Sequence, residues 1–229
     1  MIKLAKIKQK RYHKINALYN RNNDNFKLEI GNFCKPEFEI LKDIIWVGKE
    51  KIDGTNTCIL YNCRTNEFDF HGRNVDYIDD KNLQEYLISI IDVEKFKKTF
   101  KQKSDMPDTI VRIFGESYGA GIQSGGRYSK TFKFIVFDII IGDFCLKTEL
   151  SEKLAKKAGF EYTPIIFEGT LKEAEEIVTN GFTSLISEDP TLIAEGLVLI
   201  PKVDLFTRMG ERIITKIKHK DYKHLKNIK

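Results

Sequence analysis

The stretch EKIDGTN, residues 50–56, lies between two segments with strand character in a chain of 229 residues. The apolar run IIWVGK (44–49) precedes it, and the run TCILY (57–61) follows it. A lysine amine such as that of Lys51 is a nucleophile only in its neutral form, and a concave basic pocket favours that form through desolvation and neighbouring cations. Gly54 allows a ligand to approach the backbone closely. Taken alone, the stretch favours a surface turn, because Asp-Gly is a common turn dipeptide.

Outward from this stretch, the pattern predicts strands and helices in mixed order. The run 57–61 and the run EFDFH (67–71) are joined by polar residues and predict a hairpin. Further strands are predicted over residues 110–116, 132–141, 195–200 and 212–219. Helices are predicted over residues 81–101, over 149–158 up to Gly159, and from the capping box at Thr170 to about Gly181. This mixture predicts an α+β fold of antiparallel β-sheets flanked by helices.

The charge is concentrated at the two ends of the chain. The net charge is +5, but residues 1–22 hold seven basic residues and no acidic one, and residues 211–229 hold seven basic and two acidic ones. Residues 1–22 therefore read as a basic helix or arm. Basic ends around an acidic middle suit a phosphate-rich partner, and two solvated lysine-rich termini explain the charge equally well.

Two classes of protein are excluded by composition. No stretch of about 18 apolar residues is present, so we expect no membrane-spanning helix. The four cysteines form no Cys-x-x-Cys pair, so we expect free thiols in a reducing cytosol rather than a disulfide framework or a zinc ribbon. The expected location is therefore cytoplasmic, and the abundance of Lys, Ile and Asn fits an AT-rich genome such as that of a virus in a host cytosol.

Five further segments, read together with residues 50–56, carry a family resemblance. They are HGRN (71–74), FGESYGAGIQ (114–123), FIVFDI (134–139), AEGLVL (194–199) and TKIK (215–218). Together they resemble the covalent nucleotidyltransferase superfamily of ligases and capping enzymes, and specifically the ATP-dependent RNA ligases of the phage-type RNA ligase 2 family, which includes the RNA-editing ligases. The resemblance implies a nucleotidyltransferase (ATP-grasp-like ligase adenylation) domain. We expect residues 1–229 to form one such domain, with a basic N-terminal segment and no appended C-terminal domain.

Several of these positions also make chemical sense by residue type. A nucleoside triphosphate needs cations against its phosphates, and Arg73, Lys216 and Lys218 can supply them. Residues two apart on a strand share a face, so both lysines can point into one pocket, although solvated lysines on an edge strand are the alternative. A divalent metal such as Mg²⁺ or Mn²⁺ needs hard oxygen ligands, for which Glu195 is the first candidate and Glu116 the second.

The resemblance implies a role for each matching residue. Lys51 would be the nucleophile that carries AMP, with Asp53, Lys216 and Lys218 as the other catalytic residues; several close relatives have His in place of Asp53. The residues implied to bind the nucleotide are Glu50, Ile52, Asn56, Arg73, Glu116, Phe137, Glu195, Lys216 and Lys218. Among them, the ring of Phe137 would stack on the adenine, and Glu116 would hold a ribose hydroxyl. The residues implied to engage the RNA end are Asn56, Arg73 and Asp138.

The implied function is ATP-dependent RNA ligation that joins 5′-phosphate and 3′-hydroxyl RNA ends through a lysyl-AMP intermediate and an adenylylated RNA 5′ end. The expected cofactors are ATP and Mg²⁺ or Mn²⁺. Because the phage relative continues with a helical C-terminal domain, we expect the basic ends or a protein partner to supply the missing RNA surface. Two alternatives stay open: another covalent nucleotidyltransferase (a DNA ligase or a capping guanylyltransferase), and a non-catalytic protein that binds RNA ends.

Overall fold

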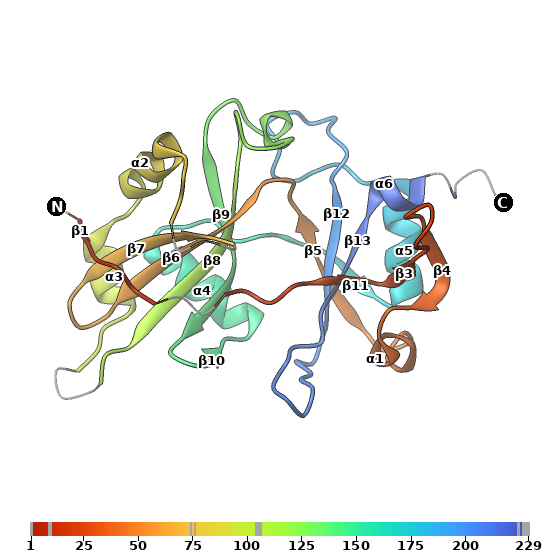
Figure 1. Cartoon of the computed structure of the whole chain (residues 1–229), viewed down its shortest axis with the longest axis horizontal. Helices are drawn as coiled ribbons and strands as arrows, with labels where there is room; N and C mark the ends of the chain where they lie inside the picture. Colours follow the sequence, from red (N-terminus) through yellow and green to blue (C-terminus); the bar gives the residue numbers. More distant parts are fainter. Residues whose placement is uncertain are drawn as a thin grey trace. The chain divides into compact units, whose positions relative to one another are not determined.

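The computed structural model describes residues 2–8, 11–73, 75, 77–103, 107–223 and 225 (Figure 1). The chain forms two compact units. Unit 1 comprises residues 1–12 and 53–163, and unit 2 comprises residues 13–52 and 164–229. Each unit combines β-sheet with helices, so the predicted α+β class is confirmed.

Unit 1 is built on a six-stranded sheet. In sheet order its strands are β1 (Lys3–Leu4), β7 (Glu67–Gly72), β6 (Thr55–Asn62), β8 (Ile110–Tyr118), β9 (Lys133–Ile141) and β10 (Phe144–Cys145). All neighbours are antiparallel except β1 and β7, which are parallel. The predicted hairpin is confirmed as β6 and β7, and β8 and β9 confirm the two strands predicted after it.

One face of this sheet carries the main core of unit 1, with α2 (Lys81–Ser89), α3 (Val93–Thr99) and α4 (Thr148–Ala158) as its helices. The ring of Phe96 on α3 lies 5.0 Å from that of Phe68 on β7 and 5.8 Å from that of Phe160. The single helix predicted over residues 81–101 is wrong, because two helices occupy the segment. Helical backbone ends at Ser89, and the Asp92 side chain accepts a hydrogen bond from the Lys95 N–H and caps a new helix.

The basic N-terminal segment is an arm and not a helix. Strand β1 is two residues long, and residues 5–8 and 11–15 have no regular secondary structure. The Ala5 N–H donates to the Phe68 carbonyl at 3.0 Å, and the Ile7 N–H donates to Asp69 Oδ2 at 2.7 Å. A main-chain carbonyl and a carboxylate of β7 therefore accept the N–H bonds that a helix would make within itself.

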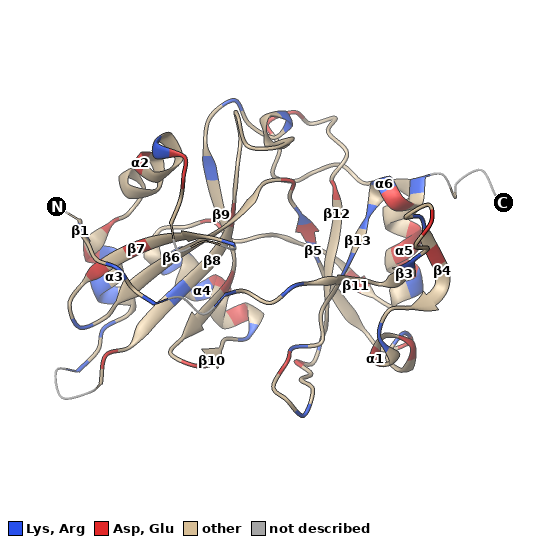
Figure 2. Cartoon of the chain, in the orientation of Figure 1, with Lys and Arg blue, Asp and Glu red and all other residues tan. Residues whose placement is uncertain are grey.

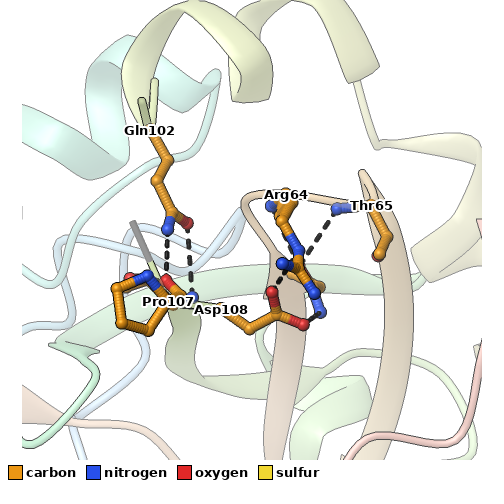
Figure 3. A network of polar contacts seen from close by, with 7 residues as sticks. Arg64, Thr65, Gln102, Pro107 and Asp108 are labelled. Carbon is orange, nitrogen blue, oxygen red and sulfur yellow. Dashed lines mark hydrogen bonds and ion pairs between the residues drawn. The ribbon is translucent and has the colours of Figure 1, made fainter. Parts of the chain in front are cut away.

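The β6–β7 turn is tied to the segment that leads into β8 (Figure 3). Asn62 Oδ1 accepts a hydrogen bond from the Arg64 N–H at 2.9 Å, and the Arg64 guanidinium forms an ion pair with Asp108. Gln102 Oε1 accepts from the Thr109 N–H at 3.2 Å. These contacts fix where β8 enters the sheet.

Unit 2 is built on a five-stranded sheet with a two-stranded ribbon. In sheet order the five strands are β11 (Ile165–Gly169), β5 (Trp46–Lys51), β12 (Gly196–Pro201), β13 (Thr215–Lys218) and β2 (Asn16–Ala17). The ribbon consists of β3 (Tyr19–Arg21) and β4 (Leu28–Phe33). Only β13 and β2 run parallel. The strand predicted over residues 212–219 is shorter than expected, because its hydrogen-bonded part begins at Thr215 and a helix begins at His219.

The helices of unit 2 are α1 (Pro36–Ile40), α5 (Leu171–Asn180) and α6 (His219–Tyr222). The predicted capping box is confirmed at the start of α5, where Thr170 Oγ1 accepts from the Glu173 N–H and Glu173 accepts from the Thr170 N–H. Among the described residues, no helix is both long enough and apolar enough to cross a bilayer.

Candidate active site

Two strands of unit 2, β5 and β13, carry lysines on one face of the sheet, on either side of β12. In the register, Lys51 on β5 lies opposite Gly196 on β12, which lies opposite Lys218 on β13. The next row joins Lys49 on β5 to Lys216 on β13 through β12. Because residues two apart on a strand share a face, all four lysines lie on the same side. We call this side the lysine face; the opposite side packs into the hydrophobic core of unit 2.

A single carboxylate holds two of these lysines. Glu195, the residue before β12, has Oε2 2.5 Å from Lys51 Nζ and Oε1 2.6 Å from Lys218 Nζ. The exposed fractions of the three side chains are 20% for Lys51, 12% for Glu195 and 23% for Lys218, so solvent screens these pairs less than ordinary surface pairs. The trio has two positive charges and one negative charge, which leaves it attractive to an anion such as a phosphate.

Gly196 separates the two lysines and cannot be replaced without strain. Its φ is +152°, and a Cβ built on it would lie 2.0 Å from the Ile217 carbonyl oxygen on β13. The absence of a side chain allows β12 and β13 to approach at the row that contains Lys51 and Lys218.

Gly196→Ala is therefore expected to lower the free energy of unfolding by about 1–3 kcal/mol. Urea denaturation measures this change. Gly126→Ala is the matched control, because its Cβ would lie no closer than 3.8 Å to a neighbouring atom. Equal stability of the two variants would contradict the strain at Gly196.

Glu50 points to the other side of β5 from Lys51. Its carboxylate accepts a hydrogen bond from Ser184 Oγ at 2.5 Å and from the Leu185 N–H at 2.9 Å. Burial raises the pKa of the Glu50 carboxyl, and the hydrogen bonds from Ser184 and Leu185 partly oppose that rise. The segment that connects α5 to β12 is thus held at both ends by neighbouring residues of β5. Glu50 binds Ser184 and Leu185 near the start of this segment, and Lys51 binds Glu195 at its end. The implied role of Glu50 in nucleotide binding stays a prediction.

Glu50→Gln is expected to gain stability relative to the unchanged protein as the pH rises from about 4.5 to 7.5. Because the pKa of this carboxyl is higher in the folded state than in the unfolded state, the folded state binds more protons between the two pKa values. The stabilisation by the neutral carboxyl is complete below the unfolded pKa of about 4.3 and is lost as the pH rises through the folded pKa. Glutamine does not titrate.

Urea unfolding of both proteins across this pH range measures the difference. The pKa of the Glu175 carboxyl is also raised by burial, but Glu175 is present in both proteins, so its contribution cancels. A stability difference that stays constant with pH would contradict the expected titration of Glu50.

Unit 1 carries most of the other predicted site residues, several of them on one face of its sheet. Asn56 on β6 lies opposite Glu116 on β8 in the register, so their side chains share a face. Asn56 Oδ1 is buried and accepts no hydrogen bond within the described residues. A buried acceptor without a donor is costly, which makes this atom a candidate contact for a ligand hydroxyl or amine. Gly54 lies close to β8, since a Cβ on it would be 2.3 Å from the Ser117 carbonyl oxygen.

Phe137 and Asp138 lie at an irregularity in β9. The register with β8 shifts between Phe114 and Gly115, where Phe114 pairs with Asp138 and Gly115 pairs with Val136, so Phe137 is the extra residue of a β-bulge. Bulges redirect side chains and are frequent beside active sites. The Phe137 ring is half-buried on the same face as Phe114.

Tyr12 of the N-terminal arm reaches both of these residues. Its ring lies 5.2 Å from that of Phe137 in an edge-on arrangement and 4.9 Å from that of Phe114. Its hydroxyl donates to Asp138 Oδ2 at 3.0 Å, and Asp138 Oδ1 accepts from the Ile139 N–H at 3.0 Å. The buried carboxylate of Asp138 is thus held in part by the hydroxyl of Tyr12, which comes from the N-terminal arm.

The remaining predicted residues are placed as follows. Arg73 directly follows β7 and is exposed, while Asn74 of the same segment lies outside the described residues. Ile52 is buried after β5, and Asp53 is half-buried between β5 and β6. Their implied roles stay predictions. No cluster of three or more His, Cys, Asp or Glu side chains able to hold a metal ion occurs within the described part of the chain.

A family model described as RNA ligase matches residues 44–218, which is well over half of the chain. The chain belongs to the RNA ligase family. The match includes both Lys51 on β5 and the two lysines of β13. It supports the family resemblance, without selecting the phage-type branch. A search of curated proteins found no match.

Solved structures of an RNA ligase from Naegleria gruberi share the fold. The complex with pyrophosphate is 19% identical with a TM-score of 0.60, and the match covers 85% of this chain and 55% of that ligase. A mutant with ATP and manganese is 18% identical with a TM-score of 0.57, covering 81% and 54%. A mutant with AMP and manganese is 16% identical with a TM-score of 0.57, covering 82% and 53%. This chain therefore spans about half the length of these ligases.

In this RNA ligase family member, three residues outside the family motifs lie beside predicted site residues, Tyr12 in unit 1 and Lys49 and Ser184 in unit 2. Lys49 is 8% exposed on the lysine face, one row from Lys51. Tyr12 contacts Phe137, and Ser184 holds Glu50. Lys49 has a sequence signal, because its spacing of two from Lys51 in a strand predicts a shared face. Tyr12 is 126 residues from Asp138 in the sequence and Ser184 is 134 residues from Glu50, so no local pattern indicates those contacts.

Proposed function

We propose that this protein is an ATP-dependent RNA ligase that joins 5′-phosphate and 3′-hydroxyl RNA ends in RNA repair. The observation that carries the proposal is the arrangement of Lys51, Glu195 and Lys218 on the lysine face of unit 2. A lysine held by a carboxylate that also holds a second lysine, within a family of ligases, suits formation of a covalent lysyl-AMP intermediate.

In the first proposed step, Lys51 Nζ attacks the α-phosphorus of ATP. A P–N bond forms, the bond between the α-phosphorus and the bridging oxygen breaks, and pyrophosphate leaves. The ammonium must first lose a proton, and Glu195 is the proposed acceptor because its Oε2 is 2.5 Å from Nζ. Lys216 and Lys218 are proposed to neutralise phosphate charge, and positioning with charge neutralisation dominates such transfers.

In the second proposed step an oxygen of the RNA 5′-phosphate attacks the phosphorus of lysyl-AMP, so a P–O bond forms, the P–N bond breaks and the Lys51 amine leaves. In the third, a 3′-hydroxyl attacks the 5′-phosphate, a phosphodiester bond forms and AMP leaves. Residues of unit 1 are proposed to bind the nucleotide and the RNA end. Phe137 would stack on the adenine and Glu116 would hold the ribose. Asn56, whose Oδ1 is a buried acceptor, would engage the RNA end together with Arg73 and Asp138.

A divalent metal fits this proposal as a companion of the nucleotide. Mg²⁺ commonly takes one or two protein carboxylates and completes its shell with water and substrate phosphates. Glu195, with Glu116 as a second candidate, would provide such a carboxylate. The metal would reduce the charge on the triphosphate. The Naegleria ligase complexes with ATP and manganese support this expectation.

The test is incubation with α-labelled ATP and magnesium, followed by a denaturing gel. The expected result is an acid-labile AMP adduct on the protein, with little adduct from labelled GTP. Sealing is then measured on nicked duplexes that carry RNA or DNA on either side of the nick, with RNA ends expected to be joined.

Each alternative has its own outcome. Labelling by GTP in place of ATP would indicate a capping guanylyltransferase, and sealing of DNA nicks alone would indicate a DNA ligase. RNA binding without any adduct would indicate a non-catalytic protein that binds RNA ends. Absence of an adduct in the unchanged protein would overturn the proposed mechanism.

A further inference from the structure

The N-terminal arm lies as a strap across one face of the unit 1 sheet. It begins beside β7, where β1 pairs with it and the Ile7 N–H donates to Asp69 Oδ2. Asp69 is itself fixed, because His71 Nε2 lies 2.8 Å from the same oxygen. The strap ends at Tyr12, which contacts Phe114 on β8 and Phe137 on β9. It therefore crosses the sheet from β7 to β9.

The apolar side chains of the strap face the sheet. Ile7 and Tyr12 pack against a buried cluster of Cys58, Leu60 and Phe114. This cluster lies on the same face of the sheet as Asn56 and Glu116, two to four residues from them along β6 and β8. The strap is seated by burial and hydrogen bonds, so its position does not depend on its charges.

The cationic side chains of the strap face away from the sheet. Lys3, Lys6, Lys8 and Arg11 are exposed, and they alternate with half-buried Ile2, Ala5, Ile7 and Tyr12. None of the four forms an ion pair with another described residue. Figure 2 shows basic positions in blue along β1 and the segment that follows it. No acidic residue occurs before Asp24, so nothing within the strap offsets the four charges.

We propose that this row of four outward cations binds the phosphate backbone of an RNA strand and directs it toward Phe137. The inference rests on the proposed function for the choice of RNA. A basic row held in a fixed line is a common way to bind a nucleic-acid backbone without reading its sequence. Tyr12 at the end of the strap contacts Phe137, the residue proposed to stack on the adenine of ATP. The strap would therefore lead from a surface that binds the RNA backbone to the proposed nucleotide-binding residue.

The test measures binding of a fluorescein-labelled single-stranded RNA by anisotropy at several salt concentrations. The variant replaces Lys3, Lys6, Lys8 and Arg11 by Gln and keeps every seated side chain. The matched control replaces four exposed lysines in or beside α4, namely Lys147, Lys153, Lys156 and Lys157, with the same change in formal charge. Unfolding midpoints of all three proteins check that the strap stays seated.

We expect the strap variant to bind RNA more weakly and to lose about 3 from the slope of log affinity against log salt, since each single-strand phosphate contact contributes about 0.7. The control should keep the slope of the unchanged protein. Equal slopes in the two variants would overturn the proposal, as would loss of binding to anionic phosphatidylserine vesicles with no loss of binding to RNA.

The lysyl-AMP assay is run on the same proteins and is expected to give equal adduct with all three. If the unchanged protein forms no adduct, the proposed ligase mechanism fails, and the anisotropy result still decides the role of the strap.

Discussion

Lys51→Ala and Lys51→Arg are both expected to form no AMP adduct, with a loss of at least about 1000-fold relative to the unchanged protein. Alanine removes the amine. Arginine keeps a cation opposite Glu195, but its guanidinium stays protonated and is not a nucleophile. Labelled ATP and a denaturing gel measure the adduct. If both variants lose the adduct, the reaction requires the amine of Lys51 and not merely a positive charge at this position.

Two controls make the result specific to Lys51. Lys202→Ala removes a lysine whose ion pair with Glu168 is on the surface of the same unit, and it should leave the adduct unchanged. Pre-adenylylated RNA bypasses the first step, so Lys51→Arg should still seal it. Full labelling of Lys51→Arg would place the nucleophile elsewhere and contradict the proposal.

Glu195→Gln is expected to slow adduct formation by at least about 100-fold, because misplacement of a reacting group by about 1 Å has an effect of that size and the variant also lacks the proposed proton acceptor. The carboxylate is the contact that fixes both Lys51 and Lys218, at 2.5 and 2.6 Å. An amide cannot pair with two ammonium groups, so the two lysines would lose their common anchor. Single-turnover rates at saturating ATP measure the effect.

The control for this prediction is Glu168→Gln, which breaks the exposed pair with Lys202 and should change the rate less than twofold. Glu195→Asp keeps the charge on a shorter side chain and should fall between the unchanged protein and the glutamine variant. Unchanged single-turnover rates in Glu195→Gln would show that the two ion pairs do not position the nucleophile.

Local patterns predicted much of the secondary structure. The alternation and polar turn of residues 57–71 predicted the β6–β7 hairpin, and the Thr170 capping box predicted the start of α5. Both signals depend on residues close in sequence. Helical periodicity over residues 81–101 was misleading, because apolar spacing continues through Asp92 although that side chain caps a second helix.

Local sequence patterns could not predict contacts between segments that are far apart in the sequence. The arm was predicted to be basic, but its seat on β7 depends on Asp69, and its end depends on Asp138 and Phe137. Motif spacing predicted that Lys216 and Lys218 share a face. It did not predict that Glu195 bridges Lys51 and Lys218, because that contact requires the register of β5, β12 and β13. Nor did it predict that Glu50 faces Ser184.

Because the side chains of Glu50 and Lys51 point to opposite faces of the sheet, the number of residues in β5 determines which partner each of them meets. Deletion or insertion of one residue between Trp46 and Glu50 would shift the register of β5 against β12 by one position. The side chains of Glu50 and Lys51 would then point to the opposite faces of the sheet. The carboxylate would then meet Glu195 across the sheet, and the amine would enter the apolar interior. Side chains along this strand can vary, but a change of their number by one would remove the Lys51 amine from its place beside Glu195.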